Sequence, residues 1–218
     1  MRLGRLPHSP SRVAAVRPHV MATTAPAPLS VPVPTWTPSL VQNDVLPSCT
    51  IAGLLNSARA WALRHDFDLV NTDPPLLSFY AGLAGCADTV AAIEATDGLV
   101  LLDVLEKAQS AGFDIGEQTP IVPEFAAIHQ PDIAGLRDAV AFRGAAYIGV
   151  TLFECDMTGA PWTGKPTGAA VGGHCIDLCA YTPDGFTAAT WGAFQPLDND
   201  WLMSRIDEAF SVMWTFPV

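Results

Sequence analysis

Positively charged residues are scarce in this chain: 11 Lys and Arg stand against 22 Asp and Glu, a formal net charge of −11. Nucleic acids and anionic membrane surfaces both require clustered Lys and Arg. We therefore expect neither nucleic acid nor a membrane as a partner, and glycine-rich phosphate loops are absent as well. Charged residues make up only 15% of the chain and hydrophobic ones 50%, which indicates a folded globular protein.

The first 41 residues are predicted to lie outside the main domain. Residues 1–20 contain four arginines and no acid, but they lack the apolar run of a secretory signal. We expect residues 1–21 to be a dispensable or disordered arm, or a mitochondrial-type presequence, with Met21 as an alternative start. Residues 22–41 are rich in proline, which blocks helices and inner strands, so they are predicted to form an extended leader. Without signal or transmembrane segment, residues 42–218 are expected to form a cytoplasmic or virion-associated domain.

The cysteine pattern argues against disulfides and metal. The chain has 5 cysteines, an odd number, and no C-x-x-C pair, so reduced thiols are expected. A zinc site would have to combine His174 with Cys155, Cys175 and Cys179, whose spacing does not match known structural zinc sites. We expect no metal and no other cofactor. The acidic stretch 198–200 is more typical of a turn than of a calcium loop.

Hydrophobic periodicity changes along the domain. Apolar residues three to four positions apart predict helices in the first part, and alternating or β-branched runs predict strands in the second. The expected helices cover 49–65, 75–83, 99–112 and 132–144, and the expected strands cover 146–153, 173–181, 186–191 and 209–216. Helices followed by antiparallel strands indicate an α+β fold with two lobes.

Cys49 lies where a polar, proline-containing loop meets the first predicted helix. Pro47 stops that helix from extending backwards, and Ser48 is the expected N-cap. The unpaired amides and the dipole of a helix N-terminus lower the pKa of a cysteine, and the thiolate is the reactive form. A free cysteine more often serves as a small buried apolar residue, so a catalytic role requires a base nearby.

His174 is the candidate base. It follows two glycines and opens a predicted strand, and glycine allows a backbone to pass close to another group. A hydrogen-bonded histidine of the core is the competing interpretation of this residue. A nucleophilic cysteine draws its base from elsewhere in the fold, and the pairing of Cys49 with His174 meets that requirement.

Over roughly residues 40–215 the chain resembles the papain-like cysteine peptidases, of the compact, diverged kind common in bacterial and phage genomes. The resemblance rests on the cysteine segment NDVLPSCTIAG, the helix 99–112, the passage GLRDAVAFRGAAYIGVTLF, the hairpin GGHCIDLCAYTPDGF and the pair Trp191-Gly192. It implies a helical N-terminal lobe and a C-terminal antiparallel β-sheet or half-barrel lobe. The site is then expected in the cleft between these lobes, with a peptide or protein as substrate.

The resemblance also implies roles for individual residues. Cys49 would attack the carbonyl of a peptide or amide bond as a thiolate, and His174 would stabilise the thiolate and protonate the leaving amine. In the family a Gln six positions before the cysteine donates to the oxyanion; Asn43 holds that position here, with Gln42 beside it. Both side chains carry an NH₂ donor, and the Cys49 backbone amide would supply a second donor.

One position departs from the family pattern. The Asn that orients the histidine, two places before the Trp, is replaced by Ala189. Thr190 is the remaining candidate to orient His174 and Trp191 to shield it, although alternation along a strand predicts that Thr190 points to the opposite face, and the same holds for Asp177 relative to His174. Losing an orienting residue weakens catalysis without abolishing it, because nucleophile, base and oxyanion donors remain.

Three functions are compatible with these residues. The first is a papain-type cysteine hydrolase; the second is a papain-fold binding or structural module with weakened catalysis, associated with phage or prophage. The third is a cell-wall amidase or endopeptidase of the smaller Cys-His type, in which the histidine usually follows the cysteine more closely. Cys49, His174 and Asn43 favour the first, and Ala189 favours the second.

Overall fold

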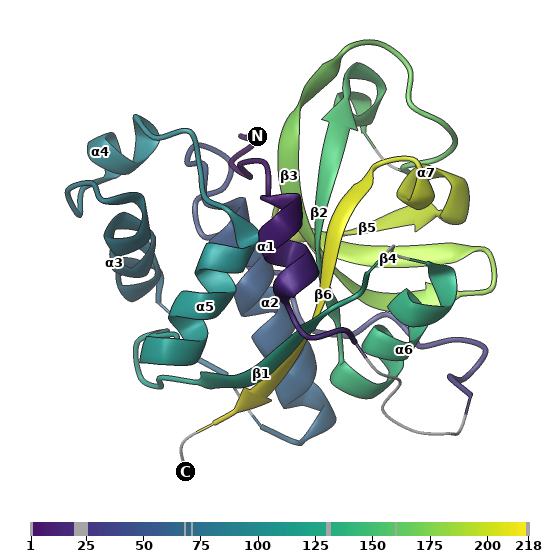
Figure 1. Ribbon diagram of the computed structural model, residues 1–218, viewed down its shortest axis with the longest axis horizontal. Helices are drawn as coiled ribbons and strands as arrows, with labels where there is room; N and C mark the ends of the chain where they lie inside the picture. Colours follow the sequence, from purple (N-terminus) through teal and green to yellow (C-terminus); the bar gives the residue numbers. More distant parts are fainter. Residues whose placement is uncertain are drawn as a thin grey trace.

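The computed structural model describes residues 2–19, 26–67, 69–70, 72–129, 132–159 and 161–216. A helical lobe and a lobe built on an antiparallel sheet lie side by side (Figure 1). The predicted α+β class and two-lobed arrangement are confirmed.

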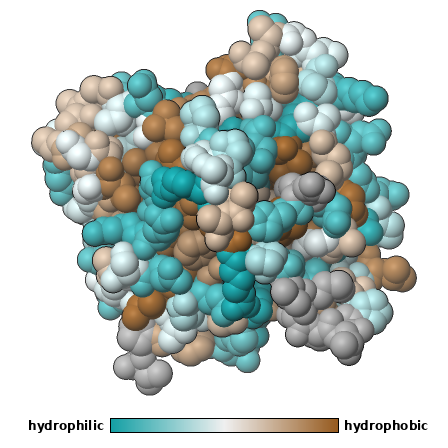
Figure 2. Space-filling model, viewed as in Figure 1, coloured by the Kyte–Doolittle hydropathy of each residue, from teal (hydrophilic) through white to brown (hydrophobic). Residues whose placement is uncertain are grey.

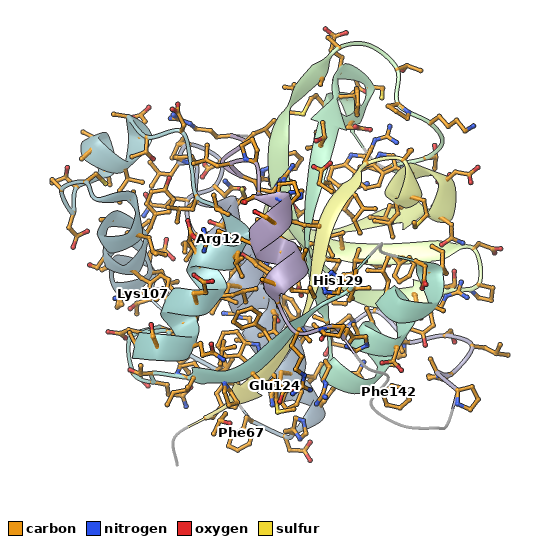
Figure 3. The ribbon with its side chains drawn as sticks, in the orientation of Figure 1. Arg12, Phe67, Lys107, Glu124, His129 and Phe142 are labelled. Atoms are coloured by element: carbon orange, nitrogen blue, oxygen red, sulfur yellow. The ribbon has the colours of Figure 1, made fainter. Side chains whose placement is uncertain are left out.

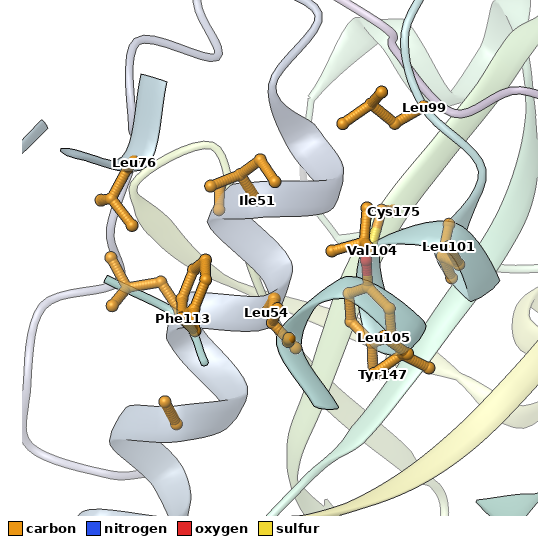
Figure 4. Packing of buried hydrophobic residues seen from close by; sticks show 14 of the residues in the cluster. Ile51, Leu54, Leu76, Leu99, Leu101, Val104, Leu105, Phe113, Tyr147 and Cys175 are labelled. Carbon is orange, nitrogen blue, oxygen red and sulfur yellow. The ribbon is translucent and has the colours of Figure 1, made fainter. Parts of the chain in front are cut away.

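The helical lobe is organised around α2 (Cys49–Arg64), a 16-residue helix that is buried over most of its length. Around it lie α3 (Asp73–Ala84), α4 (Val90–Glu94) and α5 (Leu101–Ala111). Ile51 and Leu54 of α2 pack with Leu105 of α5 and with Phe113, which are all fully buried (Figure 4). This core is continuous with residues of the sheet and holds the start of α2 in place.

In the part of the chain that the structure describes, the sheet contains six strands in the order β1-β6-β2-β3-β4-β5, and every neighbouring pair is antiparallel. The strands are β1 (Ile121–Ala127), β2 (Ala146–Phe153), β3 (Ala170–Thr182), β4 (Gly185–Thr190), β5 (Ala193–Asp198) and β6 (Ile206–Thr215). The helices α6 (Ile133–Arg143) and α7 (Asn199–Met203) and the 3₁₀ turn Glu154–Thr158 complete this lobe. The second lobe therefore has its own core, which includes Trp201, Ile148 and Ile176.

Close contact between α2 and the sheet brings the two lobes together. A Cβ added at Gly53 would lie 2.8 Å from Cys175 Sγ and 3.1 Å from the Tyr147 ring, so only glycine permits this approach. The Tyr147 hydroxyl donates a hydrogen bond to the Thr50 carbonyl at 3.0 Å. The first turn of α2, which begins at Cys49, is thereby fixed against β3, the strand that carries His174.

Sequence patterns located most elements but missed several short ones. Residues 121–127, for which no strand was predicted, form strand β1. This strand tolerates Pro123 because it lies at the edge of the sheet and pairs with β6 alone. Strand β5, the short helix α7 and the N-terminal helix α1 (Pro10–Ala15) were not predicted either. Ser48 does not cap α2 through its side chain; its Oγ donates instead to the Val41 carbonyl at 2.6 Å.

Residues 2–19 are ordered and packed, which contradicts the expectation of a disordered arm. Helix α1 lies between the two lobes (Figure 1). Arg12, which is labelled in Figure 3, pairs with Asp103 and Glu106 of α5 at 2.7 and 2.8 Å. At the end of the segment, the buried ring of His19 contacts Asp138 at 2.8 Å and Ser211 at 2.9 Å. Composition could not reveal this packing, because each arginine finds its acid far away in the sequence.

The proline-rich leader is only partly visible. Its first residues, and Met21 before them, lie outside the described residues. From residue 26 onward the chain is irregular and extended, as predicted, and Val31 forms an isolated bridge with Tyr181 of β3. The leader thus lies against the sheet lobe at this point.

The outer surface mixes polar and apolar residues. On the face seen in Figure 2, hydrophobic residues are interspersed with hydrophilic ones. Within the part of the chain that the structure describes, no helix combines the length and the apolar character needed to cross a membrane.

Candidate active site

Cys49 is the first residue of α2, at the boundary between the two lobes, and only 1% of its surface is exposed. Its thiol lies near the backbone of Cys175, the residue after His174, and near the backbone of Gly4 and Thr50. The fold therefore brings the thiol of the predicted nucleophile to the strand of the predicted base.

The protonation state of Cys49 differs from the expectation for a helix N-terminus. Burial raises the pKa of the thiol to about 11, and the nearby backbone groups and the charge of Arg5 oppose this shift only in part. The desolvation of a thiolate that is cut off from water outweighs the helix N-terminus here. In this arrangement Cys49 is a neutral thiol.

His174 lies within β3 and is fully buried. Its Nε2 atom is 2.7 Å from the Thr190 hydroxyl, and the Trp191 ring stacks on the imidazole with centroids 4.3 Å apart. The Nδ1 atom has no hydrogen-bond partner within the described residues. One ring nitrogen is therefore held by a hydroxyl while the other remains free for a reacting group.

The position of Thr190 overturns the expectation that this side chain points away from His174. Thr190 is the last residue of β4, and the next residue, Trp191, has a positive φ of 46°. Simple strand alternation is not a guide where the strand ends and the chain turns. Ala189, by contrast, is buried in a small cluster with Ala60 and Cys179.

Burial also changes the pKa of His174. Desolvation is the largest cause and the charge of Arg5 the second, and together they lower the pKa of the imidazole to about 3. Cys49 and His174 are thus both neutral in this structure. A thiolate–imidazolium pair requires that water or a polar substrate replace the groups that now cover the site.

The two predicted oxyanion donors lie in different surroundings. Asn43 is buried, and its Nδ2 donates to the carbonyls of Leu46 at 2.9 Å and Arg2 at 3.2 Å. Gln42 lines a surface hollow together with Ser39 and Asp73, and residues 2–6 do not contribute to that hollow. Asn43, not Gln42, therefore contacts the N-terminal segment of the protein, through the Arg2 carbonyl.

Residues 2–6, here called the cleft segment, cover Cys49. The Gly4 backbone contacts the Cys49 thiol, and a Cβ at Gly4 would lie 2.1 Å from the Pro47 carbonyl oxygen. Arg5 forms a parallel bridge with Leu99, and its amide donates to the Gly173 carbonyl at 3.2 Å. No sequence pattern reveals this segment, because nothing in its composition links it to Leu99 or Gly173, which are far away in the chain.

Asp177, the other residue considered near His174, has no functional contact. It is fully buried, neither carboxylate oxygen has a hydrogen-bond partner among the described residues, and burial raises its pKa well above the usual value. As predicted from strand alternation, it does not hydrogen-bond to His174, whose Nε2 is held by Thr190.

Known structures share this architecture, although no protein-family model and no curated protein matches the sequence. Xylellain, a cysteine protease from Xylella fastidiosa, superposes with a TM-score of 0.73 over 97% of this chain and 95% of its own. The fold is that of the papain-like cysteine proteases. A procathepsin B from Trypanosoma congolense gives 0.61 over 98% of this chain and 86% of its own. A cysteine protease from Carica candamarcensis, solved with E-64, gives 0.53 over 85% and 98%.

Sequence identities to these three proteins are 12%, 9% and 10%, so the likeness extends to the papain-like fold and no further. The predicted resemblance and fold class are thereby confirmed. The chemistry of the site has to be argued from this chain's own residues.

Proposed function

We propose that this chain is a cysteine-type peptidase or amidase in which Cys49 is the nucleophile and His174 the base. The observation that carries the proposal is the arrangement of His174. Thr190 and Trp191 hold its ring, Nδ1 has no hydrogen-bond partner among the described residues, and the Cys49 thiol lies near the backbone of the adjacent Cys175. A nucleophile beside a base that a third group orients is the arrangement that covalent acyl transfer requires.

The reaction follows from these positions. The Cys49 proton moves to His174 Nδ1, and the sulfur attacks the carbonyl carbon of a peptide bond and forms a C–S bond. The tetrahedral intermediate collapses, the C–N bond breaks, and His174 returns the proton to the leaving amine. Water then attacks the thioester with His174 as general base, which releases the acid and restores the thiol.

The oxyanion of this intermediate needs hydrogen-bond donors. Asn43 Nδ2 already donates to a peptide carbonyl, that of Arg2, at 3.2 Å. When a substrate replaces the cleft segment, the same N–H is free for the substrate's oxygen, and the Cys49 backbone amide at the start of α2 is a second donor. This supports Asn43, in preference to Gln42, as the side-chain donor.

The test is peptide hydrolysis combined with labelling of Cys49 by an epoxide. Cys49→Ser and His174→Ala are expected to lower hydrolysis by about 10³-fold or more, as for other catalytic pairs. Cys86→Ser is the matched control, because Cys86 is a half-buried free cysteine just after α3 that packs against the core of the helical lobe. Since the cleft segment covers Cys49, the assays are repeated in an Arg5→Ala background.

One combination of results would contradict the proposal of a peptidase. If neither background hydrolyses peptides and the epoxide does not favour Cys49 over Cys86 and Cys155, the chain is not a peptidase. Ala189, in place of the family's orienting Asn, favours in that case the alternative of a papain-fold binding module.

Thr190→Val is expected to reduce kcat/KM by about tenfold, because His174 loses a hydrogen bond worth about 1–1.5 kcal/mol. The acid limb of the pH profile should also shift, since a structural defect alone would not move the pKa of the base. Thr190→Ser restores the hydroxyl and is expected to restore both values. Thr187→Val, on the same strand, is the control, and equal losses in both valine variants would contradict an orienting role for Thr190.

A further inference from the structure

The cleft segment shows how a peptide lies in this site. Main-chain hydrogen bonds hold it: Arg2 N to Asn43 O (3.1 Å), Leu99 N to Gly4 O (2.9 Å), Leu6 N to Leu99 O (2.9 Å) and Arg5 N to Gly173 O (3.2 Å). These bonds use backbone groups only, so they do not depend on the side chains of the occupant. Recognition of this kind provides affinity through the main chain and leaves specificity to side-chain pockets.

Both walls of the cleft are shaped for a peptide backbone. A Cβ at Gly98 would lie 1.9 Å from the Gly4 carbonyl oxygen, and a Cβ at Gly173 would lie 2.4 Å from the Arg5 carbonyl oxygen. Any side chain at either position would exclude the segment. Glycine on the helical side and glycine beside the base together form a slot for an extended chain.

Next to this slot, Gly149, Asp207 and Glu208 form a pocket at a β-bulge. On β6, Glu208 pairs with Gly149 and Ile206 pairs with Val150, so that Asp207 is an extra residue in the ladder. The bulge turns the adjacent carboxylates of Asp207 and Glu208 toward the same guanidinium, whereas regular alternation would separate them. Gly149 leaves room for this, since its Cβ would lie 2.7 Å from Arg5 Cδ and 2.9 Å from Glu208 Cγ.

Arg5 fills the pocket. Its side chain is 5% exposed; it contacts Glu208 Oε1 at 3.2 Å, Asp207 through a second nitrogen, and the Val150 carbonyl at 3.4 Å. The Glu208 side chain is completely buried. A carboxylate in that position requires a cation, because an unpaired buried charge is strongly unfavourable. Two carboxylates beside a carbonyl also suit the several donors of a guanidinium better than a single ammonium.

We propose that this cleft binds extended peptides that place a basic side chain, arginine in preference to lysine, in the pocket formed by Gly149, Asp207 and Glu208. The proposal rests on the proposed function, since it names the substrate class of the same site. Glu208 is then the specificity-determining residue, and the cleft segment is an internal occupant that uses the same pocket.

The experiment measures peptide binding without turnover. The probe is a fluorescent, acetylated peptide of residues 3–7 (LGRLP), titrated into the full chain carrying Arg5→Ala and Cys49→Ala, which empties the pocket and removes the nucleophile. Sister peptides replace the arginine with Lys, Gln or Met. We expect the Arg peptide to bind at least about tenfold more tightly than the Gln peptide, as for a lost charged hydrogen bond of 1.5–3 kcal/mol, with Lys between them.

Glu208→Gln in the same background is expected to reduce the Arg-over-Gln preference to less than about threefold. Glu106→Gln, an exposed acid of α5 that pairs with Arg12 outside the cleft, should leave it unchanged. Equal binding of the Arg and Gln peptides, or a preference that survives Glu208→Gln, would overturn the proposal. If Glu208→Gln does not fold, the relative affinities of the Arg, Lys, Gln and Met peptides test the proposal on their own.

The two proposals fail in different ways. An Arg preference in binding, together with no hydrolysis by the Cys49 chain, would refute the peptidase and keep the pocket. Hydrolysis that is indifferent to basic residues would keep the peptidase and refute the pocket.

Discussion

Replacing Arg5 with alanine is expected to raise the rate of Cys49 alkylation at pH 7 by at least about tenfold. Without its guanidinium, Glu208 would be buried with only the His8 ring, at 3.9 Å, beside its carboxylate. Removing one partner of a buried ion pair costs up to about 3–5 kcal/mol, and release of the cleft segment relieves this loss by hydrating the carboxylate. Exposure would return the Cys49 pKa from about 11 toward the ordinary value of 9.0 for a cysteine thiol. Two pKa units give about 100-fold more thiolate, and the lower intrinsic nucleophilicity of that thiolate cancels about tenfold of the gain.

The pH dependence of Cys49 alkylation should also change when Arg5 is replaced with alanine. Burial, and next to it the charge of Arg5, lower the pKa of His174 to about 3, so the covered chain has no imidazolium at neutral pH. Its alkylation rate is expected to rise steadily with pH from 6 to 9.5, as for a lone thiol of high pKa. In the Arg5→Ala chain, His174 regains a pKa nearer 6.5 and can stabilise the thiolate, so the rate should level off at lower pH.

The measurement is iodoacetamide labelling followed by peptide mass spectrometry, which separates Cys49 from the other four cysteines. Arg12→Ala is the matched control: it removes another N-terminal arginine, whose ion pairs with Asp103 and Glu106 are exposed and therefore weakened by water. If Arg5→Ala and Arg12→Ala label Cys49 at the same rate while both remain folded, the cleft segment does not protect the thiol.

Local patterns predicted what depends on neighbours in the sequence. The helix that starts at Cys49 follows from Pro47 and the apolar spacing after it, and the strand that carries His174 follows from its β-rich run. The orientation of Thr190 could not be predicted in this way, because it depends on the end of β4 and on the positive φ of Trp191. Strand periodicity describes the middle of a strand and fails at its last residue.

The cleft segment and its pocket lay beyond any sequence pattern. Arg5 and Glu208 are more than 200 positions apart, and their contact requires the bulge at Asp207 and the space left by Gly149. The pKa of Cys49 could not be predicted from the sequence either. Its position at a helix N-terminus predicts a low pKa, but the cleft segment excludes water and the pKa is raised instead. Charge and burial at this site depend on tertiary structure.

Asp156→Ala is expected to lower the free energy of unfolding by about 3–5 kcal/mol, the typical loss when one partner of a buried ion pair is removed. The Asp156 carboxylate accepts hydrogen bonds from Arg205 Nε at 2.8 Å, Trp201 Nε1 at 2.7 Å and the Phe153 amide at 2.8 Å. Arg205 is only 2% exposed, so the truncation leaves its charge buried without this partner. Asp156→Asn keeps the shape and part of the hydrogen bonding, and a smaller loss is expected.

Asp156→Ala should also affect the active site, because a series of contacting aromatic rings connects Trp201 with His174. Trp201 stacks on Trp162 with centroids 4.6 Å apart, Trp162 meets Trp191 edge-on at 5.9 Å, and Trp191 stacks on His174 at 4.3 Å. Trp162 is itself tied to Asp156, because its Nε1 donates to the Asp156 carbonyl at 3.0 Å. When Trp201 loses its hydrogen bond to Asp156, the stacked rings can move, and Trp191, which covers His174, can shift with them. The rate of hydrolysis should then fall further than the smaller fraction of folded protein explains.

Urea denaturation at several pH values provides the measurement. Burial raises the pKa of Asp156, but the hydrogen bonds from Arg205, Phe153 and Trp201 outweigh it, and the net pKa is lowered. Because the folded pKa lies below the unfolded one, the stabilising contribution is complete above the unfolded value near 4 and disappears as the pH falls through the folded value. The difference between the parent chain and Asp156→Ala should therefore be constant from pH 5 to 8 and shrink toward pH 3. A difference below about 1 kcal/mol at pH 7, as for an exposed pair, would contradict a structural role for this ion pair.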